Sequence, residues 1–473
     1  MSSSSPPSLF DLAKQRLMKD EVRAIKALQS VPPFLVPPLM TEVISSRNTK
    51  ILQAIVQAWP FPCLPLRAWI EDQQAYPDVL DAALNGFDVL LDLKVPPSGC
   101  NLKVLDLRPD FIKTFWKLES SNEPCNSQSS SHSPSSGEEK PSPLVLKLVT
   151  DLCFGDACGY RVLDFLISRI EKGKVLPQLC CRTLEILRMP TTYTVKEEIL
   201  QNIHLDCVRE LEITHSLKLQ DLHSFAPFLR EMVHLNTLQL RPFIRNPCVT
   251  WAEQEMDDVY SRLTYQFLPL KQLKHLFLSS VFYPKGHLGQ ILRYLDTPLE
   301  TLSITRCLLS QSDIMCLSLC PCTGHLKCLD LHRVILTDFN PEFFRVLLQR
   351  VSATLEYLDL GGCSISDSQF TAMLPALCLC SKLHFFQFCG NQVSSVGLEN
   401  LLRETLPPNQ SRHLLLPLPL ECYGGLHGGV HPGNLQRYLT QLTLLFQEVG
   451  PPTRICMNDG FFPYDVIELW FEV

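Results

Sequence analysis

Residues 299–309 read LETLSITRCLL, and residues 355–365 read LEYLDLGGCSI. In both stretches the first, fourth, sixth, ninth and eleventh residues are apolar, and related copies begin at Leu326 and Leu383, so that successive starts lie 27, 29 and 28 residues apart. Weaker copies begin at Leu102, Val208, Leu235 and Leu273. A pattern of this length and spacing is typical of leucine-rich repeats.

Each repeat combines two periodicities. Its first half alternates apolar and polar residues, which predicts a strand with leucines pointing inward. A Cys or Asn follows at the bend, where it can contact neighbouring backbone groups, as at Cys307, Cys363 and Asn391. The second half carries helical spacing, for example in residues 343–347 and 370–377. We therefore predict an α/β fold, a leucine-rich-repeat solenoid (horseshoe) with a helical N-terminal region.

Composition and charge exclude some classes of function. The chain has 473 residues, of which 45% are apolar, and its 42 Lys and Arg against 49 Asp and Glu give a net charge of −7. This balance argues against direct nucleic-acid or membrane binding, and no apolar run has the length of a membrane span. The N-terminal MSSSSPPSLFDLAKQRLMKD lacks the apolar core of a signal peptide, so the 20 cysteines are expected to be reduced inside a cell.

The chain divides by composition into four segments. Residues 1–95 are expected to form a helical N-terminal cap and candidate docking region, and residues 96–118 a first strand and connector. Residues 119–143 contain almost nothing that can be buried, which predicts a disordered insertion. Residues 144–473 are expected to form the horseshoe with a C-terminal cap.

The first hundred residues have their own pattern. Met18, Val22 and Ile25 recur at i, i+4 and i+7, which predicts one amphipathic helix. Proline-rich breaks follow at 32–38 and 60–65. We expect this region to contribute no repeat coil and to be either a helical cap on the first repeat or a docking module.

Other motifs favour a structural role. No nucleophile elbow, phosphate loop or HExxH occurs, so we expect neither enzyme activity nor a cofactor. The cysteines at 316, 320, 322, 378 and 380 lack zinc-finger spacing, so no metal is expected. Leu398-x-x-Leu401-Leu402 matches a nuclear-receptor box, but it lies in the helical half of a repeat, which favours core packing over receptor docking.

Several blocks of the sequence, some of them unrelated to the repeat pattern, resemble the PRAME family, including its oogenesin-like members. They include LFDLAKQRLMKDEVRAI, VPPFLVPPLMTEV, LQAIVQAWPFPCLPL, PLETLSITRCLLS and SATLEYLDLGGCSISDSQ, and they cover essentially the full length. The resemblance implies a substrate-recognition subunit of a cullin-RING ubiquitin ligase of the cullin-2 type. It also implies links to repression of retinoic-acid-receptor transcription, to proliferation, and to resistance to apoptosis and differentiation.

The resemblance assigns two docking motifs. Contacts to elongin C would come from Leu17, Met18, Val22 and Ile25, although Lys26 replaces the apolar residue expected at the end of that motif. Contacts to cullin-2 would come from Val31, Pro32, Leu35 and Leu39. Pro37 and Pro38 are awkward inside a continuous helix.

We thus expect a non-catalytic adaptor of the cytoplasm and nucleus, whose partners are elongin C/B, cullin-2 with its RING subunit, and a protein target. Target contacts are expected from polar strand residues on the concave face, namely Glu300, Thr301, Ser303, Lys327, Asp330, Glu356, Tyr357, Asp359, His384 and Gln387. The alternative is a ligase-independent transcriptional corepressor scaffold of the retinoic-acid-receptor type, whose partner would be a nuclear receptor or another transcription regulator.

Overall fold

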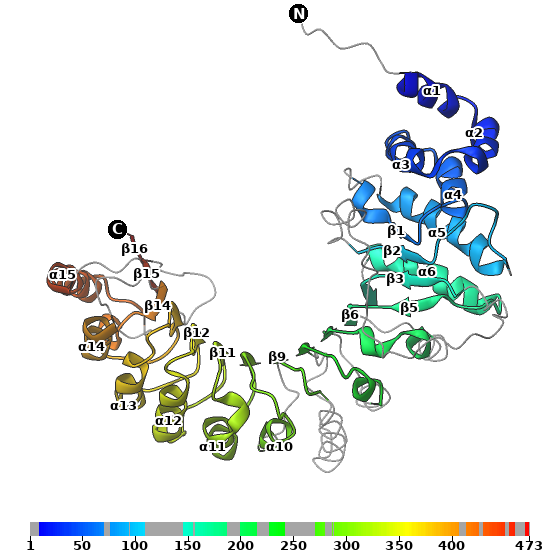
Figure 1. Cartoon of the computed structure of the whole chain (residues 1–473). Coiled ribbons are helices and arrows are strands. Elements are labelled where there is room, and N and C mark those ends of the chain that lie inside the picture. The colour runs from blue at the N-terminus through cyan, green and yellow to red at the C-terminus, as the bar shows by residue number, and fades with distance from the viewer. Residues whose placement is uncertain are drawn as a thin grey trace, which may run out of the picture. The chain divides into compact units, whose positions relative to one another are not determined.

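The computed structural model describes residues 9–70, 76–93, 95–108, 145–154, 157–186, 199–214, 227–241, 270–279, 286, 288–405, 413–424, 429–449, 454–458 and 469–472. The predicted insertion at 119–143 lies outside them. The chain forms two compact units, Met1–Val208 (unit 1) and Arg209–Val473 (unit 2), shown in Figure 1. No helix in the described ranges combines the length and apolarity needed to cross a membrane.

Unit 1 begins with helices, as the sequence predicts. They are α1 (Leu9–Met18), α2 (Glu21–Ala27), α3 (Val36–Ser45), α4 (Thr49–Gln57) and α5 (Tyr76–Asp92), with short 3-10 turns at Leu28–Ser30, Pro33–Leu35 and Leu66–Trp69. Helices α4 and α5 pack closely because Gly86 has no side chain. A Cβ atom there would lie 2.7 Å from the carbonyl oxygen of Gln53.

A small parallel sheet completes unit 1 together with α6 (Ala157–Glu171). Strands β1 (Cys63–Pro65), β2 (Val104–Asp106), β3 (Lys147–Val149) and β5 (Gln178–Cys180) pair in that order. The fully buried residues Leu64, Leu105, Leu148 and Leu179 form one aligned row. Strand β4 (Leu152–Phe154) pairs in parallel with β6 (Thr183–Ile186).

The prediction that the first hundred residues contribute no strand to a repeat is wrong. Strand β1 lies inside this region and pairs in parallel with β2. The prolines around it at 60, 62 and 65 suggested a break. A proline is compatible with an edge strand, however, and β1 is the edge of the described part of this sheet.

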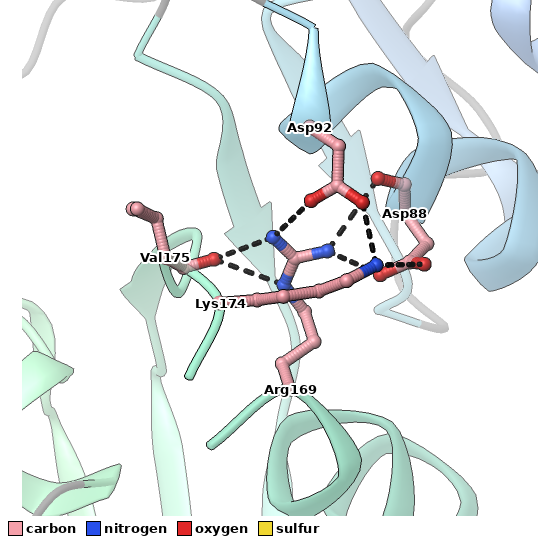
Figure 2. A network of polar contacts seen from close by, with 5 residues as sticks. All are labelled: Asp88, Asp92, Arg169, Lys174 and Val175. Atoms are coloured by element: carbon pink, nitrogen blue, oxygen red, sulfur yellow. Dashed lines mark hydrogen bonds and ion pairs between the residues drawn. The ribbon is translucent and has the colours of Figure 1, made fainter. Parts of the chain in front are cut away.

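A buried arginine ties α5 to α6 in unit 1 (Figure 2). Arg169 is 2% exposed and pairs with Asp88 and, at 3.0 Å, with Asp92. Its Nε and Nη2 atoms also donate to the carbonyl oxygen of Val175 at 2.9 and 2.7 Å. Lys174 bridges the same two carboxylates, and its hydrogen bond to Asp92 is the main cause of the lowered pKa of that group.

Arg169→Met should destabilise unit 1 by about 3 kcal/mol, because it leaves Asp88, Asp92 and a carbonyl without their buried donor. Denaturant unfolding measures this loss. Arg161→Met is the matched control, since Arg161 pairs with Asp81 at side-chain exposures of 38% and 45%, and it should cost less than about 1 kcal/mol. Equal losses from the two variants would contradict the special role of Arg169.

Unit 2 is built on consecutive parallel strands. They are β7 (Glu210–Ile213), β8 (Thr237–Leu240), β9 (His275–Ser279), β10 (Thr301–Thr305), β11 (Cys328–Asp330), β12 (Tyr357–Asp359), β13 (Phe385–Gln387), β14 (His413–Pro417) and β15 (Arg454–Asn458). Strand β16 (Leu469–Glu472) adds to β15 in the antiparallel direction. The predicted α/β class is therefore confirmed, and the structure adds that the repeat strands pair in parallel.

Helices cover one face of this sheet. Figure 1 shows α10 (Leu288–Arg293), α11 (Gln311–Leu319), α12 (Pro341–Val351), α13 (Asp367–Cys378) and α14 (Ser395–Thr405) side by side along the strands, and α15 (Pro432–Val449) follows. The inward row predicted from the repeats is at most 3% exposed, and comprises Leu211, Leu238, Leu276, Leu302, Leu329, Leu358, Phe386 and Leu414. The opposite face carries no helix in the part of unit 2 that the structure describes, and it is called the helix-free face below.

The bends after β10, β11, β12 and β13 each use a left-handed residue. Arg306, Arg333, Gly362 and Gly390 occupy equivalent positions and have φ values of 55°, 57°, 66° and 73°. The residue that follows turns into the core, and where it is Cys307, Cys363 or Asn391 its side chain binds backbone carbonyl groups, as predicted. Asn391, for example, donates to the carbonyl oxygens of Leu360 at 2.7 Å and Phe388 at 2.8 Å, and it accepts from the Ile365 amide at 2.9 Å.

Candidate functional site

The helix-free face of unit 2 carries two aligned rows of side chains, because the strands pair in register. One row contains Thr237, His275, Thr301, Cys328, Tyr357, Phe385 and His413. The other contains Gln239, Phe277, Ser303, Asp330, Asp359, Gln387 and Leu415. Polar and aromatic groups therefore alternate with the buried leucine row, as the repeat pattern predicts.

An aromatic pair lies at the centre of this face. The rings of Tyr357 and Phe385 stack with centroids 4.4 Å apart and an interplanar angle of 2°. Burial, together with the nearby Asp359 charge, raises the pKa of the Tyr357 hydroxyl, which stays protonated at neutral pH. The pair offers a flat, half-buried surface of the kind that is enriched in protein interfaces.

Two neighbouring carboxylates lie next to the aromatic pair. Asp330 accepts from the Ser303 hydroxyl at 2.7 Å and from the His332 amide at 3.0 Å. Asp359 accepts from the Gly361 amide at 2.8 Å and lies 3.3 Å from His332 Nδ1. Burial is the largest cause of the raised pKa of Asp359.

Two predicted contact residues are less accessible than exposed strand positions were expected to be. Ser303 is 7% exposed and Asp359 is 9% exposed. The backbone bend at Gly361 packs closely against Asp359, because a Cβ atom at Gly361 would lie 3.1 Å from Asp359 Oδ1 and 2.9 Å from His332 Nδ1. The Ser303 hydroxyl donates to Asp330 at 2.7 Å. Their main contribution is therefore to hold Asp330, His332 and the bend in place.

Charged side chains border the face where the strands begin. Glu300 pairs with Lys274 at 2.9 Å and with Lys327 at 2.8 Å. The hydrogen bonds from Lys327 and Lys274 lower the pKa of Glu300 to about 2. Glu356 and His384 continue this border at the next two strands, and His384 is exposed.

Beside the carboxylates lies a pocket of about 390 Å³, whose lining includes Arg241, Phe277, Arg306 and His332. The contact prediction did not include these residues or Phe385. Phe277 and Phe385 could have been found by extending the same repeat positions to neighbouring strands. The contacts of Arg241, Arg306 and His332 depend on how the bends fold, which the repeat spacing does not encode.

The N-terminal motif residues are arranged differently from the prediction. Helix α1 ends at Met18, and Asp20 caps the separate helix α2 by accepting from the Arg23 amide at 3.1 Å. The single helix predicted to carry Met18 and Val22 is therefore wrong, because the Asp20 side chain competes for a backbone donor and starts a new helix.

Exposure divides the predicted elongin-docking residues into two pairs. Val22 is 63% exposed and Ile25 is 37% exposed, whereas Leu17 and Met18 are half-buried. The two exposed side chains both belong to α2.

The predicted cullin-docking residues also differ in exposure. Pro32 is exposed, Val31 and Leu35 are half-buried, and Leu39 is only 4% exposed in the core of unit 1. Prolines 37 and 38 cause no break because they lie in the first turn of α3, where a missing amide costs little. Sequence reasoning missed Phe34, which is 72% exposed and occupies a position that the motif leaves unspecified.

The receptor-box leucines are core residues, as predicted. Leu398, Leu401 and Leu402 are at most 1% exposed. Within the described ranges, no group of three or more His, Cys, Asp or Glu side chains is arranged to hold a metal ion.

Comparisons with known proteins match most of the chain. The family model for the PRAME C-terminal domain matches residues 146–464, and that for the PRAME N-terminal domain matches residues 6–116. PRAME family member 12 of Homo sapiens is 38% identical over 464 residues, which cover 97% of this chain and 94% of that protein. PRAME family member 8 of Homo sapiens is 38% identical over 89% of this chain and 88% of its own length. Preferentially expressed antigen in melanoma-like protein 1 of Mus musculus is 39% identical over 85% of this chain and 86% of its own length.

Proposed function

The chain belongs to the PRAME family, and from this premise we propose that it is the substrate-recognition subunit of a cullin-2-type ubiquitin ligase. Its repeats would form a leucine-rich-repeat horseshoe whose concave side is the helix-free face. The regular succession of a strand, a left-handed residue, an inward bend residue and a helix supports this architecture.

The observation that carries the docking proposal is the exposure of apolar side chains near the N-terminus. Val22, Ile25 and Phe34 expose apolar surface to water. Each of them lies within a segment that was assigned to elongin or cullin docking. Exposed apolar groups of this kind gain free energy when a partner covers them. We assign elongin C binding to Val22 and Ile25 of α2, and cullin-2 binding to Phe34 and Pro32.

The helix-free face would bind the protein target. The stacked Tyr357 and Phe385 rings offer apolar contact area, and Asp330 beside them offers hydrogen-bond acceptors. Aromatic groups flanked by polar ones are typical of residues that dominate binding energy in protein interfaces. Glu300, Lys327 and Glu356 at the border would contribute to specificity rather than to affinity.

The mechanism is tethering. With the ligase scaffold on unit 1 and the target on unit 2, target lysines meet the loaded ubiquitin carrier at high effective concentration. No residue of this chain makes or breaks a bond in this process. Degradation of the target, in the cytoplasm or the nucleus, would then reduce transcription, differentiation and apoptosis and promote proliferation.

Affinity purification of the full chain from cells tests this proposal. A ligase subunit should retain elongin C and cullin-2 in near-stoichiometric amounts. Recovery of a retinoic-acid receptor and chromatin enzymes without elongin C would instead support the ligase-independent corepressor. Burial of the receptor-box leucines argues against that alternative, at least through this motif.

A further inference from the structure

A second pocket lies on the helical side of unit 2, away from the helix-free face. It has a volume of about 500 Å³ and lies between α10 and the end of α11. Its lining includes Leu292 and Arg293 from α10, Met315 and Cys316 from α11, and Cys320 just after α11. The pocket therefore brings two thiols and a cationic side chain to the surface.

A third thiol lies directly behind this wall. The sulfur atoms of Cys320 and Cys322 are 3.2 Å apart, and both lie near the carbonyl oxygen of Leu292, at 3.5 and 3.7 Å. Cys320 is half-buried and lines the pocket, whereas Cys322 is 2% exposed. A small molecule in the pocket would meet Cys320 first and could not reach Cys322 directly.

The backbone around the two thiols is held firmly. Pro321 separates them, and the Thr323 hydroxyl donates to the Cys320 carbonyl oxygen at 2.8 Å. Arg350 of α12 donates to the same oxygen at 2.8 Å and also binds the Ser318 carbonyl. These bonds keep the two side chains together.

The environment favours a thiolate on the outer cysteine. When Cys320 is a thiolate, the Cys322 thiol 3.2 Å away is the donor in the contact between the two sulfur atoms. This hydrogen bond outweighs the effect of burial and, together with the Arg350 and Arg293 charges, lowers the pKa of Cys320 to about 6. The same contact and burial raise the pKa of Cys322. By contrast, burial raises the pKa of Cys363 and of Cys389 to about 12, and these thiols stay inert at neutral pH.

We propose that Cys320 and Cys322 form an oxidant-sensitive dithiol that reacts with hydroperoxides entering the pocket. The Cys320 thiolate attacks the terminal hydroxyl oxygen of the peroxide, and the O–O bond breaks. Cys320 becomes a sulfenic acid as hydroxide leaves from hydrogen peroxide, or as an alkoxide leaves from an organic hydroperoxide. The Cys322 sulfur then attacks the Cys320 sulfur and expels hydroxide, which takes the Cys322 proton and leaves as water. Two thiols are thereby oxidised to one disulfide, and one peroxide is reduced.

Closing the disulfide requires a modest movement. The S–S bond is about 2.05 Å long, so the two sulfur atoms must approach by about 1 Å. The proposal does not depend on the ligase function, since it involves neither the N-terminal residues nor the helix-free face.

Hydrogen peroxide treatment of the full chain, followed by peptide mass mapping with differential alkylation, tests the proposal. The wild-type chain should form a Cys320–Cys322 disulfide that dithiothreitol reverses. Cys322→Ser should instead accumulate a sulfenic acid on Cys320 that dimedone traps, and Cys320→Ser should give neither product. Cys316→Ser is the matched control from the same pocket and should behave as the wild type. At pH 7, Cys320 should react about tenfold faster than Cys316.

Three results would overturn the proposal: preferential oxidation of Cys316, a Cys316–Cys320 disulfide in the wild type, or an unmodified Cys320 at peroxide doses that oxidise free glutathione. The thermal transition of each variant, followed by circular dichroism, shows whether it remains folded. The wild-type mapping decides the question even if a variant does not fold.

Discussion

Leu358→Asp should abolish the cooperative unfolding transition of unit 2. Leu358 is completely buried in β12, between Leu329 of β11 and Phe386 of β13 in the same row. The substitution removes apolar packing and places a carboxylate where no water can solvate it, at a cost of about 5 kcal/mol or more. Such a cost is comparable with the whole stability of a typical domain. Denaturant unfolding followed by circular dichroism measures it.

His384→Asp is the matched control for the new charge. His384 lies at the start of the neighbouring strand and its side chain is exposed, so the same carboxylate should cost less than about 0.5 kcal/mol there. Asp359→Ala is not a suitable neutral control, although its sequence position suggests one, because Asp359 accepts from the Gly361 amide at 2.8 Å. A Leu358→Asp chain as stable as His384→Asp would contradict the inward and outward assignment.

Val22→Asp combined with Ile25→Asp should lower the affinity for elongin C at least 100-fold, an estimate based on burying unpaired charges at an interface. Val22 is 63% exposed and Ile25 37% exposed in the free chain, and neither belongs to the core, so the fold should be retained. Pull-down of elongin C together with a thermal melt of the chain measures both effects. Phe34→Asp should similarly weaken the binding of cullin-2 and leave the binding of elongin C unchanged.

Val95→Asp combined with Val145→Asp provides the matched control for that double variant. These two valines are 74% and 61% exposed, and they lie in unit 1 outside the assigned motifs. The control adds the same charge and should bind elongin C like the wild type. If both double variants lose elongin C equally, the effect is one of net charge and the assignment to α2 fails.

Sequence periodicity was sufficient to predict the parts of the fold that repeat. One local pattern, which recurs in each repeat, predicts three features of the fold. These are the buried leucine row, the inward bend residues Cys363 and Asn391, and the burial of the receptor-box leucines. The strand residues on the helix-free face follow from the same alternation.

Features that depend on single residues or on distant contacts were not predictable in this way. The helix break at Asp20 arises from one side chain that caps a backbone amide, which a search for apolar spacing does not register. Arg169 meets Asp88 and Asp92 across 81 and 77 residues of sequence. The low exposure of Asp359 depends on how tightly the bend at Gly361 folds back.

The most direct test of the adaptor role is a calorimetric titration of the purified full chain with the purified elongin B–elongin C heterodimer. We predict saturable one-to-one binding by the wild-type chain and by the Val95→Asp, Val145→Asp control, and loss of that binding in the Val22→Asp, Ile25→Asp variant. A folded wild-type chain that shows no binding at concentrations of tens of micromolar would contradict a ligase-adaptor function.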